Sequence, residues 1–225
     1  FDQVDRLDVR VGDTIVIEKA GEIIPQVVQV LHDKRPGDTE PIEPPDKCPA
    51  CGGPTARDEG GVYLRCIDPE CPAQLRERLQ FFAGRNQMDI DYLGPKVIDQ
   101  LVDRGLVEHF ADLYKLSVED LIDLDRMAEK SARNLVDAVQ ASKGRGLARV
   151  LAGLGIRYVG NRASELIARR YRDVDELMDA DREELERIGE IGPVIAESLH
   201  QYLTSHRGRD AIRRLKEVGV DMTSQ

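Results

Sequence analysis

The stretch Ile188-Gly-Glu-Ile-Gly-Pro-Val-Ile-Ala196 places two glycines and a proline between apolar residues near the end of the chain. Gly192 directly precedes Pro193, and proline is favoured at the first position of a helix. Ala196 follows with a small side chain, which allows two helices to come close. This stretch predicts a helix, a tight hairpin that contains Gly189 and Gly192, and a second helix.

The same register occurs three more times toward the N-terminus. With Gly192 as the anchor, the equivalent positions are Gly160, Ala128 and Gly94, at successive spacings of 32, 32 and 34 residues. An apolar residue stands four positions before each anchor (Ile90, Leu124, Ile156 and Ile188) and another seven positions after it (Leu101, Leu135, Ile167 and Leu199). Tetratricopeptide and ankyrin repeats have similar periods, but their diagnostic residues are absent. The register predicts an all-α domain of four helix–hairpin–helix repeats over residues 75–225, with each first helix ending at the residue four before its anchor.

Glycine at the hairpin has a specific physical use. Without a side chain at the start of the second helix, a phosphate can approach the unpaired backbone N–H groups and the positive end of the helix. In any one copy the glycine could instead simply end the first helix. Four copies in register favour phosphate binding. The second copy has Ala128 in place of the glycine and is expected to serve mainly as scaffold. The expected DNA contacts are Gly94, Lys96, Lys130, Arg157, Gly160, Arg162, Gly189 and Gly192.

The charge distribution is uneven. The whole chain carries a net charge of −10, so it is not coated in positive potential. Residues 143–172 nevertheless hold eight basic side chains against one acid, Glu165, and surround the third hairpin. Such a run is often only a solvated face, but its position at a hairpin favours a DNA-facing surface. The acidic residues 173–190 are expected to face away from the nucleic acid.

All four cysteines lie within one short segment, as Cys48-x2-Cys51 and Cys66-x4-Cys71 with fourteen residues between the pairs. Two such knuckles can surround one tetrahedral ion, so the spacing predicts a closed, structural zinc site. Disulfides and an iron–sulfur cluster are the alternatives. The otherwise thiol-free sequence, without an apolar leader or a run of membrane-spanning length, favours a reducing cytoplasm and no membrane partner.

The N-terminal part has a different pattern. β-branched residues at 9–11, 14–18 and 26–31, separated by Gly12-Asp13 and by Ala20-Gly21-Glu22, predict strands of a small β unit over residues 1–33. Residues 34–46 are rich in proline and predict a linker, and residues 47–74 form the cysteine module. So few strands do not make a stable sheet alone, and the chain begins with Phe1, so we expect a piece of a longer protein.

Composition agrees with several small domains and a mainly α multidomain fold. The sequence is 33% charged and only 4% aromatic, which is little material for one large core. No catalytic residue is expected, because the histidines are scattered and there is no Gly-Lys-Ser/Thr loop for a nucleotide.

Three segments in this order carry a family resemblance: Asp8-Val-Arg-Val-Gly-Asp13 with Lys19-Ala-Gly-Glu-Ile-Ile-Pro-Gln-Val-Val28, the four-cysteine module, and the four helical repeats. Together they resemble the bacterial NAD-dependent DNA ligases. The resemblance implies that the β unit is the second half of an OB-fold and that the cysteines bind zinc. It also implies that the repeats grip the minor-groove side of nicked duplex DNA through its phosphate backbone. The whole enzyme would use NAD and Mg²⁺ to seal nicks during replication and repair.

The sequence departs from the family in three respects. The adenylated lysine of the family lies in a Lys-x-Asp-Gly motif, which is absent here, so this chain alone is expected to be inactive and to bind neither NAD nor Mg²⁺. Glu18 and Glu22 stand where relatives often carry a basic residue and an aspartate, and Ala128 replaces a hairpin glycine. The partners expected are nicked duplex DNA and other domains of the same protein. The alternative is a free-standing zinc and helix–hairpin–helix DNA-binding scaffold without ligase activity.

Overall fold

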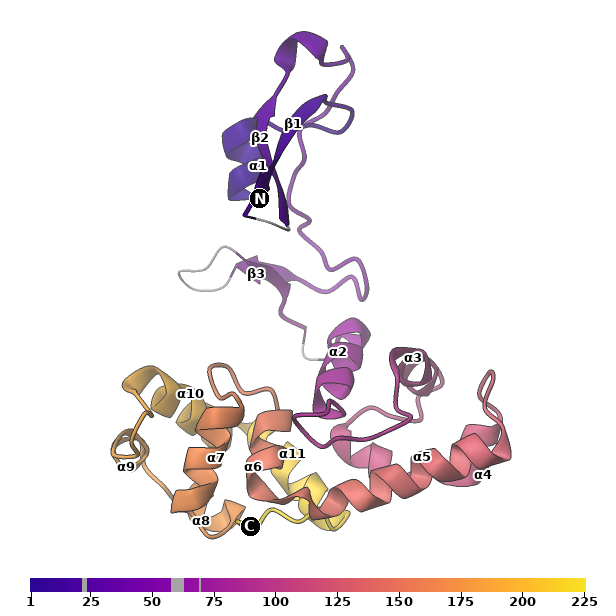
Figure 1. Cartoon of the computed structure of the whole chain (residues 1–225), viewed down its shortest axis with the longest axis vertical. Helices are drawn as coiled ribbons and strands as arrows, with labels where there is room; N and C mark the ends of the chain where they lie inside the picture. Colours follow the sequence, from indigo (N-terminus) through magenta and orange to yellow (C-terminus); the bar gives the residue numbers. More distant parts are fainter. Residues whose placement is uncertain (22–23, 58–62, 69) are drawn as a thin grey trace. The chain divides into compact units, whose positions relative to one another are not determined.

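The computed structural model describes residues 1–21, 24–57, 63–68 and 70–225, so Glu22 lies outside the described residues. The chain divides into two compact units, Phe1–Cys71 and Pro72–Gln225. The first contains short strands and the second is helical, as Figure 1 shows. The fold is therefore mainly α with a small β part, as expected. The finer boundaries drawn from the sequence, with a linker at 34–46, stay predictions.

The first unit is built on one β-hairpin. Strands β1 (Ile15–Ala20) and β2 (Ile24–Val30) pair antiparallel with Ile15 opposite Val30, and a bulge interrupts the register after Val16. Helix α1 (Asp2–Leu7) packs against β2, and the 3-10 turn η1 (His32–Lys34) follows it. Farther along, β3 (Thr55–Arg57) and β4 (Leu64–Cys66) form a second antiparallel pair.

The strand predicted over residues 9–11 is wrong. Arg10 makes only an isolated bridge to Pro41, and its N–H donates to the Asp13 carboxylate at 2.8 Å. The Asp13 N–H in turn donates to the Arg10 carbonyl oxygen, which closes a turn. The backbone groups that a strand would use are therefore occupied within the turn.

Charged side chains replace an apolar core in this unit. The Arg35 guanidinium donates to Asp13 at 2.8 Å and to Asp8 at 2.7 Å, which ties the segment after η1 back to the β-hairpin. Hydrogen bonds from Arg35 also hold the pKa of the Asp13 carboxyl below its usual value. Val30 is the only buried hydrophobic side chain besides the cysteines among the described residues of this unit. Ile17 and Ile24 remain exposed.

The second unit is an array of helices that share one hydrophobic core. Its elements are α2 (Pro72–Phe82), α3 (Pro95–Asp103), η2 (Phe110–Lys115), α4 (Val118–Ile122), α5 (Glu129–Ser142), η3 (Lys143–Arg145), α6 (Gly146–Gly153), α7 (Asn161–Arg170), α8 (Val174–Met178), α9 (Arg182–Glu186), α10 (Pro193–Thr204) and α11 (His206–Glu217). The apolar residues seven after each anchor, Leu101, Leu135, Ile167 and Leu199, are all completely buried. The apolar residues at the position four before each anchor are also buried, except Ile188, which is partly buried against the same core. The repeat register is therefore confirmed.

The first helix of each repeat ends earlier than predicted. Helices α4, α6 and α9 end two or three residues before Leu124, Ile156 and Ile188, and α2 ends well before Ile90. In the last three copies the carbonyl oxygen of the apolar residue instead accepts a hydrogen bond from the N–H three residues later, at 3.0 to 3.1 Å. Leu124, Ile156 and Ile188 thus each begin a β-turn. The carbonyl oxygen of each residue accepts the hydrogen bond that closes the turn, so it does not continue the helix.

Specific polar contacts join the four repeats in the spatial order second, first, third, fourth (Figure 1). The Asp125 N–H in the second hairpin donates to Gln100 on α3 at 2.6 Å. Gln87, in the loop after α2, donates to Asn161 at the start of α7 at 3.2 Å. Ser198 on α10 donates to the Arg157 carbonyl oxygen in the third hairpin at 2.6 Å. The first and third repeats, which are not consecutive in sequence, are therefore neighbours.

The C-terminal segment is held against α6, α7 and α8. Val174 N–H donates to the Met222 carbonyl oxygen at 3.0 Å, and Leu147 N–H donates to that of Thr223 at 2.8 Å. Ser224 adds a hydroxyl donation to the Ala168 carbonyl oxygen at 2.6 Å. These contacts satisfy carbonyl and N–H groups at helix ends that would otherwise need water or side chains.

Candidate nucleic-acid interface and metal centre

The four cysteine sulfurs converge on one point. All four Sγ atoms lie within 4.8 Å of one another, with Cys48 to Cys71 at 3.9 Å and Cys51 to Cys66 at 3.6 Å. A zinc ion with four thiolates at about 2.3 Å requires sulfurs about 3.8 Å apart. The cysteine side chains therefore fit a tetrahedral zinc ion that uses every coordination position.

Local backbone structure brings the sulfurs together. Cys48 N–H donates to the Gly53 carbonyl oxygen at 2.7 Å, and Gly52 N–H donates to that of Cys48 at 2.8 Å. Gly53 also needs to be glycine, because a Cβ there would lie 2.9 Å from the Cβ of Asp68. Cys66 ends β4 and Cys71 directly precedes α2, so an element boundary fixes each of the last two ligands.

The thiols do not titrate alike. Backbone N–H groups of Ala50 and Cys51 lower the pKa of the Cys48 thiol to about 7. At Cys51 the Gly53 N–H lowers the thiol pKa, but burial and the neighbouring thiols outweigh it and raise the pKa to about 12. Four thiolates this close would also repel one another unless a cation neutralised them. A bound zinc dication would supply that charge.

The hairpin helices begin in a uniform way. Gly94, Ala128, Gly160 and Gly192 are the N-caps of α3, α5, α7 and α10, all extended with φ between −83° and −91°. None of these four N-caps, all inside residues 70–225, accepts a side-chain hydrogen bond from its helix. By contrast, side chains of Ser117, Asp173, Asp181 and Ser205 cap α4, α8, α9 and α11. The hairpin helices alone among these eight have no side-chain acceptor for their first N–H groups. At α3 and α10 the first residue is a proline without an N–H, and the N–H of Val97 or Ile195 donates to the carbonyl oxygen of the cap glycine, so fewer N–H groups are open there.

The cap glycines are not needed for packing. An added Cβ at Gly94, Gly160 or Gly192 would meet no atom within 4 Å, and their φ values suit any residue. Ala128 adopts the same backbone conformation with a side chain present. Each cap glycine therefore leaves open space beside the start of its helix.

Each hairpin also contains a residue in the left-handed conformation, which sequence reasoning missed. It lies two positions before each N-cap: Tyr92, Arg126, Tyr158 and Glu190, with φ between 61° and 69°. Left-handed backbone is characteristic of the third residue in a type II turn, where glycine is preferred. The constant offset from the anchor was the available signal, but none of the four residues is glycine, so composition did not reveal it.

All eight residues predicted to contact DNA are exposed. Gly94 and Lys96 lie at the start of α3, Lys130 at the start of α5, and Gly160 and Arg162 at the start of α7. Arg157, Gly189 and Gly192 lie in or at the edge of the third and fourth hairpins. The structure therefore places every one of them at a hairpin or the first turn after it, while their contacts with DNA stay predictions.

The basic run 143–172 is not one free surface. Arg145 donates to the Asp89 carboxylate at 2.9 Å, and Arg149 donates to the Gln87 carbonyl oxygen at 2.9 Å, so both hold the loop after α2. Arg162 pairs with Glu190 of the fourth hairpin, where their Nε–Oε2 distance is 3.1 Å. Several cations of the run thus have structural partners that the local count of charges did not show.

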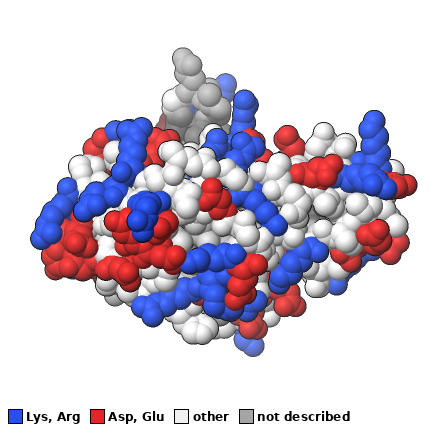
Figure 2. All heavy atoms as spheres, turned by 90° about the horizontal axis from the view of Figure 1, so that it is seen from below, with Lys and Arg blue, Asp and Glu red and all other residues white. Residues whose placement is uncertain are grey.

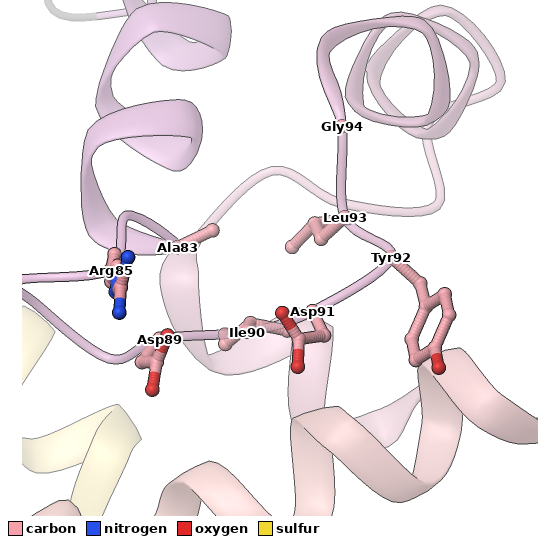
Figure 3. Close-up of a pocket in the computed structure, with 8 residues that line it drawn as sticks. All are labelled: Ala83, Arg85, Asp89, Ile90, Asp91, Tyr92, Leu93 and Gly94. Atoms are coloured by element: carbon pink, nitrogen blue, oxygen red, sulfur yellow. The ribbon is translucent and has the colours of Figure 1, made fainter.

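Figure 2 shows one face of the helical unit with basic and acidic side chains intermingled. Acidic side chains gather at the left, where α8 and α9 lie in Figure 1. The first hairpin borders an open hollow of about 790 Å³, lined by Arg85, Asp89, Tyr92 and Gly94 among others (Figure 3). Its lining mixes the charged side chains of Arg85, Asp89 and Asp91 with apolar side chains.

No helix in the described part of the chain combines the length and apolar character that crossing a bilayer requires.

Fold and site together define a class: a modular protein with a four-cysteine metal centre and a tandem helix–hairpin–helix array. Comparison with known families places each module. The NAD-dependent DNA ligase OB-fold domain matches residues 1–39 and the NAD-dependent DNA ligase C4 zinc finger domain matches residues 47–73. A SAM-like helix-hairpin-helix tandem matches residues 88–141, and a helix-hairpin-helix motif matches residues 149–212.

Comparison with the full sequences of curated proteins points to the same family. The chain is 48% identical to a DNA ligase of Halothermothrix orenii over 220 residues, which is 97% of the chain and 33% of the relative. It is 48% identical to a DNA ligase of Lysinibacillus sphaericus over 216 residues, which is 96% of the chain and 32% of the relative. A DNA ligase of Pelotomaculum thermopropionicum is 46% identical over 224 residues, which is 100% of the chain and 33% of the relative. The chain belongs to the NAD-dependent DNA ligase family and spans about a third of the length of these curated relatives.

Proposed function

We propose that this chain is the part of an NAD-dependent DNA ligase that holds nicked duplex DNA, through phosphates bound at the hairpins. The observation that carries the proposal is the contrast between helix starts. The helices that follow a hairpin lack a side-chain acceptor, whereas α4, α8, α9 and α11 have one. Helix α6 also lacks one, but its Leu147 N–H donates to the Thr223 carbonyl oxygen instead. An anion completes the hydrogen bonding of an open helix start without any lysine, which reconciles the net charge of −10 with a nucleic-acid ligand.

The contribution to nick sealing is positional. In the whole enzyme, AMP passes from NAD to a lysine, then to the 5′-phosphate at the nick, and is expelled by the 3′-hydroxyl. The Lys-x-Asp-Gly motif for the first step is absent from this sequence. Holding both sides of the nick would keep the reacting groups close together, an effect that binding energy can supply. NAD and Mg²⁺ would serve the longer protein, acting in the cytoplasm.

Zinc would have a structural role. Cys48, Cys51, Cys66 and Cys71 fill a tetrahedron, so no coordination position is left for a substrate. The described part of this unit has almost no buried apolar side chains. The ion would therefore stabilise the module between the β-hairpin and α2.

The test is to place a branched side chain at the open helix starts. Gly160→Val and Gly192→Val should each weaken binding to a nicked duplex, because the methyl groups occupy the space that a phosphate needs. Losing one anchored phosphate should cost about 1 to 3 kcal/mol. Folding should be retained, since φ is −88° and −83° at these positions and an added Cβ meets nothing. Fluorescence anisotropy titrations on nicked and intact duplexes measure the loss.

The second hairpin supplies matched controls. Ala128→Val should have little effect, because a Cβ already stands there, and Ala128→Gly should leave binding unchanged or tighten it. Arg157→Ala should lower affinity equally for all DNA sequences and reduce the salt dependence by about one unit, as the loss of one phosphate contact requires. If both valine variants fold normally and bind nicked DNA as tightly as the parent, the hairpins are structural and the proposal is wrong.

A further inference from the structure

We propose that the rings of Tyr92 and Tyr158 pack on the deoxyribose groups of the strand whose phosphates are bound at Gly94 and Gly160. This proposal rests on the proposed function and adds the residues that contact the sugars. Both tyrosines occupy the left-handed position of their hairpins, with φ of 67° and 65°. Glycine adopts that conformation freely, whereas an L-residue with a large side chain is strained there.

Both rings are exposed in spite of that strain. Tyr92 is 60% exposed and Tyr158 is 55% exposed, whereas Tyr114 and Tyr171 are buried in the core of the same unit. The residue that follows each exposed ring, Leu93 or Val159, is buried. The hairpin backbone thus directs alternate side chains inward and outward. A large ring held outward at a strained position does not contribute to the hydrophobic core. The Arg157 guanidinium lies 4.9 Å from the centroid of the Tyr158 ring, so only the remaining surface of that ring is open to a sugar.

The position of the rings matches a bound strand. Two residues of chain span at most about 7 Å, so the Cα atom of each tyrosine lies within about 7 Å of the Cα atom of the following N-cap, and its ring can reach a sugar next to a phosphate held there. Deoxyribose presents an apolar C–H edge between successive phosphates, and the face of an aromatic ring packs well on such a surface. Contact with the sugar is independent of base sequence, as a ligase that meets nicks in any sequence requires.

The two tyrosine hairpins are also neighbours in space. Gln87, in the loop that leads to Tyr92, donates to Asn161, which begins the helix after Tyr158. Tyr92 lies at the edge of the hollow beside Gly94, and its ring points away from Asp89 and Arg85 (Figure 3). The second and fourth hairpins have Arg126 and Glu190 at the equivalent position. Sugar packing therefore belongs to the adjacent first and third hairpins.

The experiment substitutes the left-handed residues in this chain with zinc bound and measures binding to a nicked duplex. Tyr92→Gly and Tyr158→Gly should each weaken binding roughly three- to tenfold, a range in which tenfold corresponds to about 1.4 kcal/mol. Tyr92→Phe and Tyr158→Phe should stay within about twofold of the parent, because the ring is retained. The slope of affinity against salt should be unchanged for Tyr92→Gly, since no charge is removed.

The control for backbone strain is Glu190→Gly compared with Glu190→Gln, because both remove the charge that pairs with Arg162 and only glycine relieves the strain in the fourth hairpin. The two variants should bind alike. Melting temperatures of the glycine variants should stay within a few degrees of the parent, since relief of strain offsets the lost contacts of each half-exposed ring. If Tyr92→Gly and Tyr158→Gly bind as tightly as the parent while Gly160→Val binds weakly, the sugar contact is refuted and phosphate binding stands. If Gly160→Val also binds like the parent, the proposed function is refuted as well.

Discussion

At the scale of single residues, the equivalent positions of the four hairpins share a backbone conformation but differ in chemistry. The left-handed residue is tyrosine twice, arginine once and glutamate once. Glu190 accepts from Arg162 of the preceding repeat, and this hydrogen bond holds the pKa of the Glu190 carboxyl below its usual value of 4.5. A depressed pKa means that the ion pair is present above the usual range and is lost only as pH falls through the lowered value. At neutral pH the carboxylate would therefore compete with the phosphate that we propose Arg162 binds.

Glu190→Gln should consequently tighten binding to a nicked duplex. The substitution keeps the size of the side chain but removes the competing charge, so Arg162 becomes available to a phosphate. We expect an increase in affinity of roughly two- to fivefold at low salt and a steeper salt dependence, measured by anisotropy titration at several salt concentrations.

Glu183→Gln on α9 is the control for the change in net charge, because Glu183 is exposed and makes no ion pair among the described residues. An equal gain from both substitutions would assign the effect to overall charge. A loss of affinity in Glu190→Gln would show instead that Glu190 orients Arg162 for binding.

At the scale of elements, the two units are stabilised by different means. The helices of the second unit bury a continuous set of leucines, isoleucines and valines. In the first unit, ion pairs of Arg35 and the four convergent cysteines take that place. A structural zinc site commonly supplies the folding free energy that a small core lacks, about 10 kcal/mol or more.

Removal of zinc should therefore unfold the cysteine module and leave the helical array folded. Cys66→Ser, or a strong chelator, should abolish stoichiometric zinc and expose residues 47–71 to proteolysis. The far-UV circular dichroism of the helices should be almost unchanged, because α2 to α11 pack within the other unit. Metal analysis and limited proteolysis measure both effects.

Two results would contradict the metal centre. One is protein purified without chelator that contains no zinc, and the other is a pair of disulfides among the four cysteines by mass spectrometry. Ser117→Ala, at a helix cap far from the cysteines in sequence, is a suitable control, because it should lower stability by about 1 kcal/mol without loss of metal.

At the scale of the whole molecule, the repeats form one array whose spatial order is not the order of the chain. Contacts of Gln87, Ser198 and Asp125 set this order, and the C-terminal segment secures the third repeat. The array presents four helix starts while the chain spans about a third of its curated relatives. We therefore expect this chain to bind DNA without catalysing a reaction by itself.

Incubation of the chain with NAD and Mg²⁺ should therefore leave its mass unchanged. No lysine of this sequence lies in the Lys-x-Asp-Gly motif that the family adenylates. Intact-protein mass spectrometry detects a covalent AMP adduct directly, and a ligase that contains the motif serves as the positive control. Formation of an adduct would mean that a nucleotide site exists in these residues and would contradict the binding role proposed here.

The amino-acid sequence by itself predicted the modules and their periodicity. The spacing of Cys48, Cys51, Cys66 and Cys71 predicted one metal centre, and the anchors at Gly94, Gly160 and Gly192 predicted the starts of three helices. These features succeed because they are local: ligand convergence and helix starts depend on residues a few positions apart. The strand expected at residues 9–11 failed for a similarly local reason, since the Asp13 carboxylate competes for the backbone of Arg10.

Only the tertiary structure decided which charges are free and which repeats are neighbours. The run from 143 to 172 counted as strongly basic, but the partners of Arg145, Arg149 and Arg162 lie 28 to 64 positions away in sequence. A charge becomes available to DNA only if folding brings no carboxylate or carbonyl oxygen to it, and that depends on contacts between repeats. For the same reason, a periodic pattern establishes that four hairpins exist, while long-range packing decides which of them lie side by side.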